Sequence, residues 1–321
     1  MHIIKVSGNH SDLGRKLGQT LKKEIRHRLR NLHITDEMVD SYKTQLKRIH
    51  SMCAKAYPHQ IEALRSMAEH ADIDYWKILL LNSPELRLTK DGCSTIVTNG
   101  INGIRIFHNE DADKGDRKSD FVLVEFLHKG RKFHFFVYPG ELGGTAFNWN
   151  SSGLFFTVNY VNSGKSQQGI PRYFTAHAMI YSKSIKECLS IIQRHPDASG
   201  FHYYIGFGKT VLSAETYRGS VSLKYIQGMD FHTNHYIHKR FSYFESYNNS
   251  DVRLGRIKQL LNEGRYPLNI LFDKKNRPDS IYSQAGDVNL TVATVVFDTK
   301  NRTISIYDKT PRYPIRRFKL K

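Results

Sequence analysis

The sequence has few cysteines and no long hydrophobic run. Its three cysteines, Cys53, Cys93 and Cys188, cannot all pair with one another, and none belongs to a Cys-x-x-Cys spacing. A disulfide framework or a zinc site is therefore not predicted, and a reducing compartment is the simplest inference. The first residues lack the apolar core of a signal peptide, and no apolar stretch approaches membrane-spanning length. We expect a soluble, cytoplasmic protein with no membrane partner.

Acidic residues are scarce relative to basic ones. The chain has 48 Lys and Arg against 30 Asp and Glu, a formal net charge of +18, which suits nucleic acid, a membrane surface or anionic substrates. In the densest basic run, residues 22–30, Leu and Ile recur at helical spacing among the basic residues. This pattern is typical of an amphipathic helix whose basic face is exposed to solvent. We expect no nucleic-acid partner. The alternative that stays open is a basic nucleic-acid- or anion-binding protein in which Cys93 has no catalytic role.

Internal repeats and low-complexity linkers are also absent, so the 321 residues are expected to form one compact unit. Helical periodicity runs from residue 11 to residue 81, and two further helices are predicted near 172–193 and 252–261. Between these segments, β-branched and aromatic residues separated by turn residues are typical of strands. The predicted strands begin after Cys93 and include 104–107, 121–127, 132–138, 154–158, 203–205, 211–215, 222–226, 293–297 and 303–307, with a hairpin turn at 128–131. The pattern predicts an α+β layered fold with a helical N-terminal segment.

The most informative short motif is the pair Gly92-Cys93, in a polar turn that leads into the apolar run Ile96-Val97. A glycine leaves its own carbonyl open to attack and tolerates unusual backbone geometry. A thiol that follows directly is placed to attack that carbonyl. The alternative is a bystander cysteine after an ordinary turn.

Two other polar segments supply groups that amide chemistry at a thiol requires. Asp111 follows the strand at 104–107, and the turn at 99–103 would bring it back towards Cys93. The segment from His232 to His235 offers two imidazoles and, in Asn234, a carboxamide that could donate to an oxyanion.

Metal and cofactor sites are not predicted at these segments. The acidic run 111–116 resembles a calcium loop, but Val122 stands where such a loop needs its bidentate Glu. We therefore expect Asp113 and Asp116 to belong to a solvated turn. His232 and His235 lack a third ligand at a recognisable spacing.

Five motifs in register resemble one family. They are the segments 91–95, 109–111, 150–154, 169–171 and 232–235, with Gly8, Leu13-Gly14 and Leu17-Gly18 similar to an opening motif. Together they resemble the acyl-coenzyme A:6-aminopenicillanic acid acyltransferase family of N-terminal nucleophile (Ntn) hydrolases. The resemblance implies a four-layer αββα sandwich, with residues 1–92 as a helical propeptide or α-chain and residues 93–321 as the catalytic β-chain.

The resemblance also implies roles for individual residues. Cys93 would be the self-cleaving residue and the nucleophile, and Gly92 would supply the cleaved carbonyl. Asp111 would assist maturation and orient the new amine, while Asn234 would serve the oxyanion.

Other positions are implied as substrate-binding or supporting residues. Asn109, His232 and His235 lie within the matching motifs. The family's Arg near its final strand has two poor candidates, Lys309 and Arg312. His177 stands in the helix after Pro171, where family members often carry Arg.

These implications predict a cysteine-dependent amidohydrolase or acyltransferase acting on a small acyl amide or acyl thioester. Cleavage would free the α-amine of Cys93, whose ordinary pKa of about 7.7–8.0 lets it take the proton from its own thiol. Hydrolysis and acyl transfer stay open as outcomes, because water and an amine compete for the same acyl-enzyme. A second hypothesis also stays open: the chain remains intact, and His108, His232 or His235 serves as the base.

Overall fold

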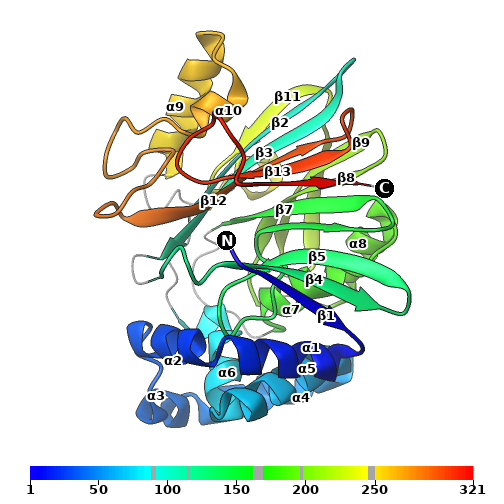
Figure 1. Ribbon diagram of the computed structural model, residues 1–321, viewed down its shortest axis with the longest axis vertical. Helices are drawn as coiled ribbons and strands as arrows, with labels where there is room; N and C mark the ends of the chain where they lie inside the picture. The colour runs from blue at the N-terminus through cyan, green and yellow to red at the C-terminus, as the bar shows by residue number, and fades with distance from the viewer. Residues whose placement is uncertain (88–91, 114–115, 162–168, 196–197, 245–249, 321) are drawn as a thin grey trace.

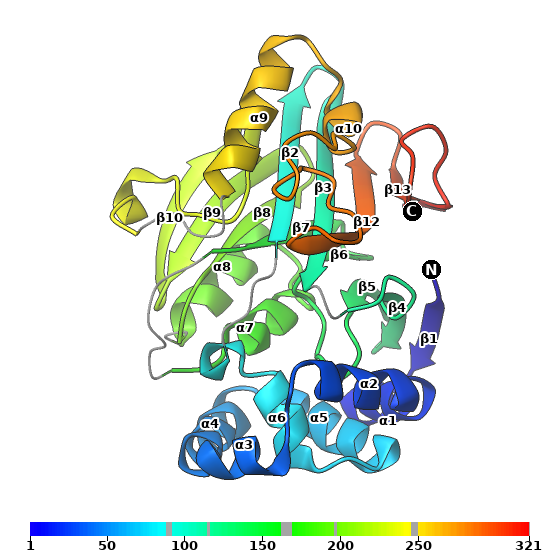
Figure 2. The ribbon, with the colours of Figure 1, turned by 90° about the vertical axis from the view of Figure 1, so that its left-hand side faces the viewer.

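Four layers, two of strands between two of helices, make up the structure (Figures 1 and 2). It is a computed structural model that describes residues 1–87, 92–113, 116–161, 169–195, 198–244 and 250–320. Lys90 and Asp91 of the motif around Cys93 lie outside these residues. The predicted α+β, four-layer fold class is confirmed.

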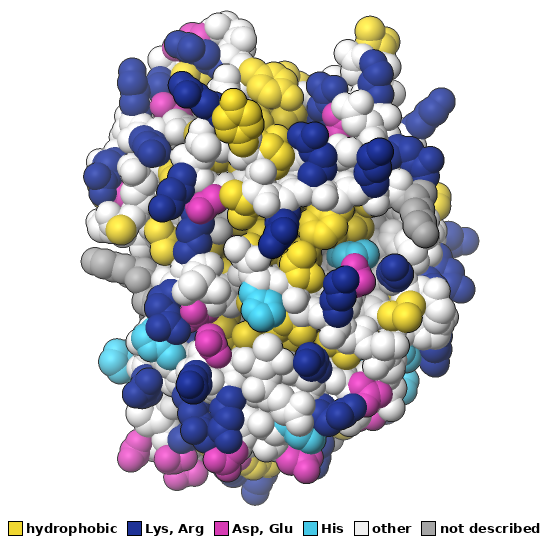
Figure 3. All heavy atoms as spheres, viewed as in Figure 1, with side chains coloured by type: hydrophobic (Ala, Val, Ile, Leu, Met, Phe, Trp, Pro, Cys, Tyr) yellow, Lys and Arg dark blue, Asp and Glu magenta, His cyan; other side chains and the backbone are white. Residues whose placement is uncertain are grey.

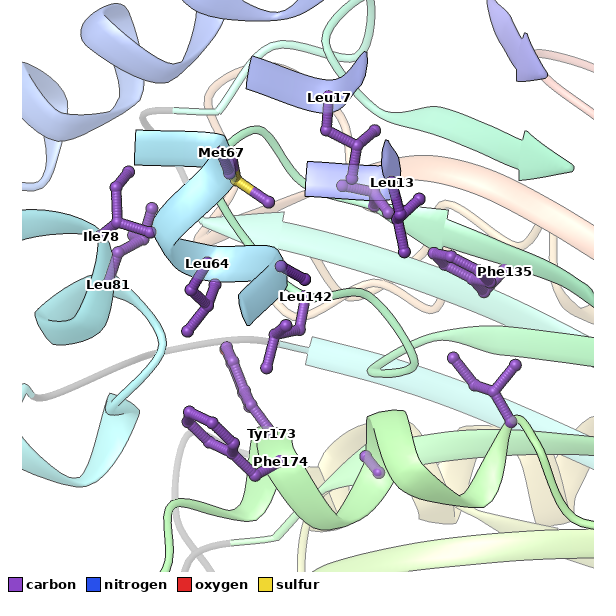
Figure 4. Close-up of a cluster of buried hydrophobic side chains, with 14 of the residues drawn as sticks. Leu13, Leu17, Leu64, Met67, Ile78, Leu81, Phe135, Leu142, Tyr173 and Phe174 are labelled. Carbon is purple, nitrogen blue, oxygen red and sulfur yellow. The ribbon is translucent and has the colours of Figure 1, made fainter. Parts of the chain in front are cut away.

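The first helical layer comes largely from the N-terminal segment. After the strand β1 (Ile3–Ser7), the chain forms α1 (His10–Thr20), α2 (Lys22–Asn31), α3 (Asp36–Ser41), α4 (Lys43–Ala56), α5 (Pro58–Ala71), α6 (Tyr75–Leu81) and the short turn η1 (Pro84–Leu86). Apolar side chains of these helices meet those of β5 and α7 in one buried cluster (Figure 4). This cluster joins residues before Cys93 to residues after it.

An eight-stranded sheet lies on this layer. Its order is β1, β4 (Val122–His128), β5 (Arg131–Val137), β6 (Phe147–Asn150), β7 (Leu154–Tyr160), β8 (Phe201–Phe207), β9 (Thr210–Tyr217) and β10 (Ser220–Tyr225). The helices α7 (Arg172–Met179) and α8 (Ile185–Arg194) pack on the same outer face as the N-terminal helices. β1 pairs in parallel with β4, so the N-terminal segment supplies the edge strand of this sheet.

A six-stranded sheet packs on the inner face of the first. Its order is β11 (Gly228–His232), β2 (Gly92–Gly100), β3 (Gly103–Asp113), β12 (Asn289–Asp298), β13 (Thr303–Tyr307) and β14 (Arg316–Lys319). An apolar core fills the space between the sheets, where the Phe155 and Phe297 rings stack with centroids 3.7 Å apart. The helices α9 (Ser250–Asn262) and α10 (Pro267–Ile270), preceded by η2 (Lys239–Phe241), cover the outer face.

Several predicted elements differ from the observed ones. The helix expected over 172–193 is two helices, because the Ser184 side chain caps a new start by accepting from Glu187 N. The strands β1, β6, β11 and β14 were not predicted; β6, β11 and β14 contain no Val, Ile or Thr, the β-branched residues that favour a strand prediction. The hairpin turn at 128–131 is confirmed by positive φ at Lys129 and Gly130.

The expectation of a solvated acidic turn is wrong for Asp116. Its side chain is 8% exposed and lies 3.0 Å from the guanidinium of Arg28 on α2. Arg28 also pairs with Glu141 at 2.7 Å, so a buried cation of the N-terminal segment serves two carboxylates of the later chain.

Basic side chains are spread over the surface. On the face in Figure 3, Lys and Arg lie in all regions, with acidic side chains between them. Within the described parts of the chain, no helix combines the length and the apolarity needed to cross a membrane.

Close packing of α1 on α5 depends on two glycines. A Cβ at Gly14 would lie 2.0 Å from Ala63 O, and one at Gly18 would lie 2.4 Å from Met67 O. Both obstacles are backbone atoms, which cannot turn aside as a flexible side chain does.

We therefore expect Gly14→Ala to lower the free energy of unfolding by about 2 kcal/mol or more, because overpacking outweighs the better helix propensity of alanine. Gly255→Ala on α9 is the matched control, since nothing lies within 4 Å of its added Cβ. That variant should gain about 0.5–1 kcal/mol. Urea denaturation of both variants measures the difference, and equal midpoints would contradict the packing argument.

Candidate active site

The hairpin of β2 and β3 positions the first candidate residues. Its register pairs Cys93 with Glu110 and Gly92 with Asp111. Because side chains alternate along a strand and cross-strand partners share a face, these two pairs point to opposite sides of the sheet. The Cys93 and Glu110 side chains point towards the eight-stranded sheet, and Asp111 points towards α9.

The apolar residues of the same strands confirm this alternation. Val97 and Ile106 lie in the core between the two sheets. Ile96 and Phe107 pack instead with Ile257 of α9.

On the α9 side, one guanidinium contacts three parts of the site. Arg253 Nη1 donates to Cys93 O at 2.9 Å and to Ser94 Oγ at 3.1 Å. Its Nη2 donates to Asn234 Oδ1, and Nη1 lies 3.9 Å from Asp111 Oδ2. Arg253 is buried, so its charge acts on these groups with little screening by water.

Asn234 lies against the backbone nitrogen of Cys93 rather than against its sulfur. Its Oδ1 accepts from Cys93 N at 3.0 Å, and its Nδ2 donates to Tyr160 O at 3.0 Å. The second contact fixes the orientation of the carboxamide. The expected donation to an oxyanion is therefore not the contact that Asn234 makes in this structure; it holds the nitrogen that cleavage would convert to an amine.

A set of buried hydrogen bonds holds the loop that carries Asn234. Ser250 Oγ, at the start of α9, accepts from Asn234 N at 2.6 Å and bonds His235 Nδ1 at 2.7 Å. Glu215 of β9 bonds His232 Nε2 at 3.0 Å and accepts from Ile237 N. His232 and His235 thus hold the Asn234 loop in place through Glu215 and Ser250.

Asp111 is buried beside the bond between Gly92 and Cys93. Its Oδ1 accepts from Thr291 Oγ1 at 2.6 Å, and among the described residues Oδ2 has no hydrogen-bond partner. Burial raises the pKa of the Asp111 carboxyl, and the nearby Arg253 charge opposes that rise.

Two side chains lie close to Gly92. A Cβ there would lie 2.2 Å from Asn289 Nδ2 and 3.2 Å from Asp111 Cβ. A larger residue would require the end of the flexible Asn289 side chain to move and Asp111 to shift slightly, whereas glycine fits without either change.

On the other face of the sheet, the thiol meets a buried polar cluster. Cys93 Sγ lies 3.7 Å from Glu110 Oε2, and His108 Nε2 lies 3.2 Å from the same oxygen. Tyr138 OH donates to Glu110 Oε1 at 2.8 Å. Burial raises the pKa of Glu110 well above its ordinary value and lowers that of His108 to about 4.

The same three side chains have metal-binding geometry. The ligand atoms of Cys93, His108 and Glu110 all lie within 4.8 Å of one another. A thiolate, an imidazole and a carboxylate are ligands that zinc accepts. The absence of a metal site therefore stays a prediction. Direct hydrogen bonds already join the three groups.

The cavity at the thiol is small. Cys93, Glu110, Tyr138 and Arg28 of α2 border a space of about 10 Å³, which is room for roughly one water molecule. Among the described residues, the space beside Cys93 is too small for a small-molecule substrate.

Three predicted positions do not join the site. The buried His177 contacts Tyr181 and the ring of Phe135 on the outer face of the eight-stranded sheet, and burial lowers its pKa to about 3. Lys309 and Arg312 lie exposed in the turn after β13. The structure therefore gives no support to them as the family's Arg, since the guanidinium at Cys93 is that of Arg253.

Asn109 joins β3 to the chain segments that follow α9. Its Nδ2 donates to Leu271 O at 2.7 Å and to Ile281 O at 3.0 Å, so it attaches β3 to the chain around α10.

Sequence reasoning missed Arg253, and a signal for it exists. Arg253 stands four residues before Ile257 and seven before Leu260, the spacing of the buried stripe of α9. A charged residue at an apolar position of an amphipathic helix indicates a buried partner. Glu110 on β3 is a second charged residue at a buried position. It lies between Asn109 and Asp111 in a strand that is buried on both faces, so its side chain also needs a polar partner.

A curated protein and two solved structures are similar to parts of this chain. A match over 160 residues is 22% identical to the β-alanyl-dopamine/carcinine hydrolase of Drosophila melanogaster, covering 43% of this chain and 41% of the fly protein. Two solved structures are similar at low identity. One is a mutant of the conjugated bile acid hydrolase from Clostridium perfringens, at 10% identity and a TM-score of 0.39, covering 67% of this chain and 88% of that one. The other is penicillin V acylase from Agrobacterium tumefaciens, at 11% and 0.36, covering 67% and 82%.

A family-level match covers most of the chain. It extends over residues 98–313 and so includes Asp111, Asn234 and Arg253 but begins after Cys93. The chain belongs to the family described as acyl-coenzyme A:6-aminopenicillanic acid acyl-transferase.

Proposed function

We propose that the protein is an Ntn amidohydrolase or acyltransferase that cleaves itself between Gly92 and Cys93 and then uses Cys93 as its nucleophile. The observation that carries this proposal is the set of buried polar groups around the backbone of Cys93. Asn234 Oδ1 accepts from its nitrogen, Arg253 donates to its carbonyl, and Asp111 lies opposite Gly92 in the pairing of β2 with β3. Membership of an acyltransferase family supports the reaction class.

Self-cleavage would turn the present contacts into those of a working site. The nitrogen of Cys93 would become an α-amine, with Asn234 Oδ1 still in position to accept from it. Such an amine titrates near neutrality and can take the proton of the Cys93 thiol. Asp111 Oδ2, which accepts no hydrogen bond from the described residues, would be the second acceptor for that amine.

The substrate class follows from the chemistry of the nucleophile. A thiolate attacks the carbonyl of a small acyl amide or acyl thioester and passes the acyl group to water or to an amine. The β-alanyl amide that the fly relative's name describes is one example of such a substrate. The net charge of +18 is compatible with an anionic acyl donor.

Self-cleavage predicts two chains of 92 and 229 residues. We expect intact-mass analysis to find both chains in the wild-type protein and one uncut chain in Cys93→Ala. Cys53→Ala and Cys188→Ala are matched controls, because both thiols are buried in helices elsewhere, and both variants should cleave. An uncut wild-type chain would contradict the proposal.

The contacts of Arg253 predict that lysine cannot replace it, since one ammonium cannot span Cys93 O and Asn234 Oδ1. Arg253→Lys should slow self-cleavage by roughly 10- to 100-fold, the loss expected for a charge-assisted hydrogen bond. Arg256→Lys is the control: it lies on the same helix and bonds Asp273 at 2.7 Å, away from Cys93. Equal cleavage rates in the two variants would remove Arg253 from the site.

The N-terminal chain should remain bound after cleavage, because it supplies the edge strand β1 and the buried Arg28. We expect the two chains to co-elute in gel filtration. Arg28→Met should destabilise the complex by about 3–5 kcal/mol, since Asp116 and Glu141 lose their cation. Arg15→Met, which breaks only an exposed pair with Asp12, should cost about 1 kcal/mol or less. Release of the 92-residue chain from the wild type would overturn this prediction.

A further inference from the structure

The proposed self-cleavage needs a base that the mature enzyme does not need. Before cleavage the nitrogen of Cys93 is an amide and cannot accept the thiol proton. Among the described residues, the carboxyl group in contact with Cys93 Sγ is that of Glu110, at 3.7 Å. Asp111, the acid that the family resemblance implies, projects from the opposite face of the sheet and bonds Thr291.

Glu110 is one end of a hydrogen-bonded pair with His108. Thr95 Oγ1 donates to Asn159 Oδ1 and lies 2.8 Å from His108 Nδ1. With Asn159 oriented in this way, Nδ1 donates to Thr95 and the neutral ring presents Nε2 as an acceptor. Nε2 lies 3.2 Å from Glu110 Oε2, so one proton must lie between the carboxyl and the imidazole.

We propose that Glu110 is the proton acceptor for the Cys93 thiol during self-cleavage, with His108 as the second member of the relay. The inference rests on the proposed cleavage at Gly92-Cys93 and assigns to that step a base of its own. Glu110 is then a catalytic residue of maturation.

The step balances in protons and bonds. As Cys93 Sγ bonds to the Gly92 carbonyl carbon, the thiol proton moves to Glu110 Oε2, whose own proton moves to His108 Nε2. The C–N bond then breaks, and the departing nitrogen of Cys93 receives a proton back through the same pair. Water hydrolyses the thioester, giving the Gly92 carboxyl group and a free Cys93 thiol.

The groups around Glu110 favour the state in which Glu110 and His108 share one proton. Cys93, His108 and Tyr138 touch the carboxyl, and further charged groups act on it from neighbouring elements. These groups are Asp111 on β3 and Glu141 after β5. Arg28 on α2 borders the same space, and its guanidinium stacks over the Tyr138 ring. Burial and the two acids raise the pKa of Glu110, while the bond from Tyr138 lowers it.

The relay predicts that one substitution affects the rate of self-cleavage and the turnover of the cleaved enzyme to different degrees. In the mature protein the α-amine serves as base, and a protonated Glu110 only donates a hydrogen bond, as glutamine also can. Glu110→Gln should therefore slow self-cleavage by roughly 10²–10⁴-fold, the usual contribution of general acid–base catalysis. The fraction that has cleaved should lose far less in turnover than the precursor loses in cleavage rate.

The experiment follows precursor conversion in cell-free translation on denaturing gels, and then the burst of p-nitrophenyl acetate hydrolysis by the cleaved fraction. Glu125→Gln is the matched control, because Glu125 Oε2 also lies 3.2 Å from a histidine nitrogen, His134 Nε2, on another sheet. The control should cleave at the wild-type rate. A much larger loss of cleavage rate than of turnover, in Glu110→Gln and not in Glu125→Gln, supports the relay.

Other outcomes overturn the relay in distinguishable ways. Wild-type cleavage rates in Glu110→Gln would remove the base and leave self-cleavage intact. A parallel loss of cleavage, turnover and melting temperature would show a structural role only. A wild-type chain that never cleaves would defeat the proposed function and the relay together. Stoichiometric zinc in the purified precursor, with cleavage accelerated by EDTA, would make the three side chains a metal site instead.

Tyr138→Phe tests the same relay if Glu110→Gln fails to fold. Losing the hydroxyl removes a bond that favours the ionised carboxyl, so the pKa of Glu110 rises further. Because Glu110 gives its own proton to His108 as it takes the thiol proton, loss of the bond that stabilises its ionised form should slow self-cleavage in this variant while the melting temperature stays near that of the wild type. A wild-type cleavage rate in a folded Tyr138→Phe protein would overturn the role of Glu110.

Discussion

The register between β2 and β3 is the constraint on which the rest of the site depends. Pairing Cys93 with Glu110 and Gly92 with Asp111 places the thiol and the peptide bond in front of different sets of groups. A slip of one residue would exchange these sets, because side chains alternate between the two faces of the sheet. The apolar cores on both faces hold the register, since Val97 and Ile96 must each meet their own layer.

The two faces divide the chemistry. On the α9 side, Arg253 and Asn234 hold the carbonyl and the nitrogen of Cys93 and so fix its backbone. On the inner side, Glu110 and His108 form a polar cluster at the sulfur. Arg28, a side chain of the N-terminal segment, borders the small cavity there.

Sequence predicted the layered fold and the hairpin that carries Gly92, because strand and turn signals in β2 and β3 are local. It could not predict β1, whose partner β4 lies more than a hundred residues later. The family resemblance offered only two poor candidates for its Arg, Lys309 and Arg312 near the end of the chain, whereas the buried guanidinium at Cys93 comes from a helix. Arg253 reaches Cys93 through packing of α9 on the sheet, a contact that no short motif expresses.

The central claim is that the peptide bond between Gly92 and Cys93 is cut by Cys93 itself. N-terminal sequencing of the larger chain from freshly purified wild-type protein tests this claim most directly. The account predicts a chain that begins with Cys93, followed by Ser94 and Thr95, and no such chain from Cys93→Ala. A single chain that begins only at the original N-terminus, or a cut at another bond, would contradict it.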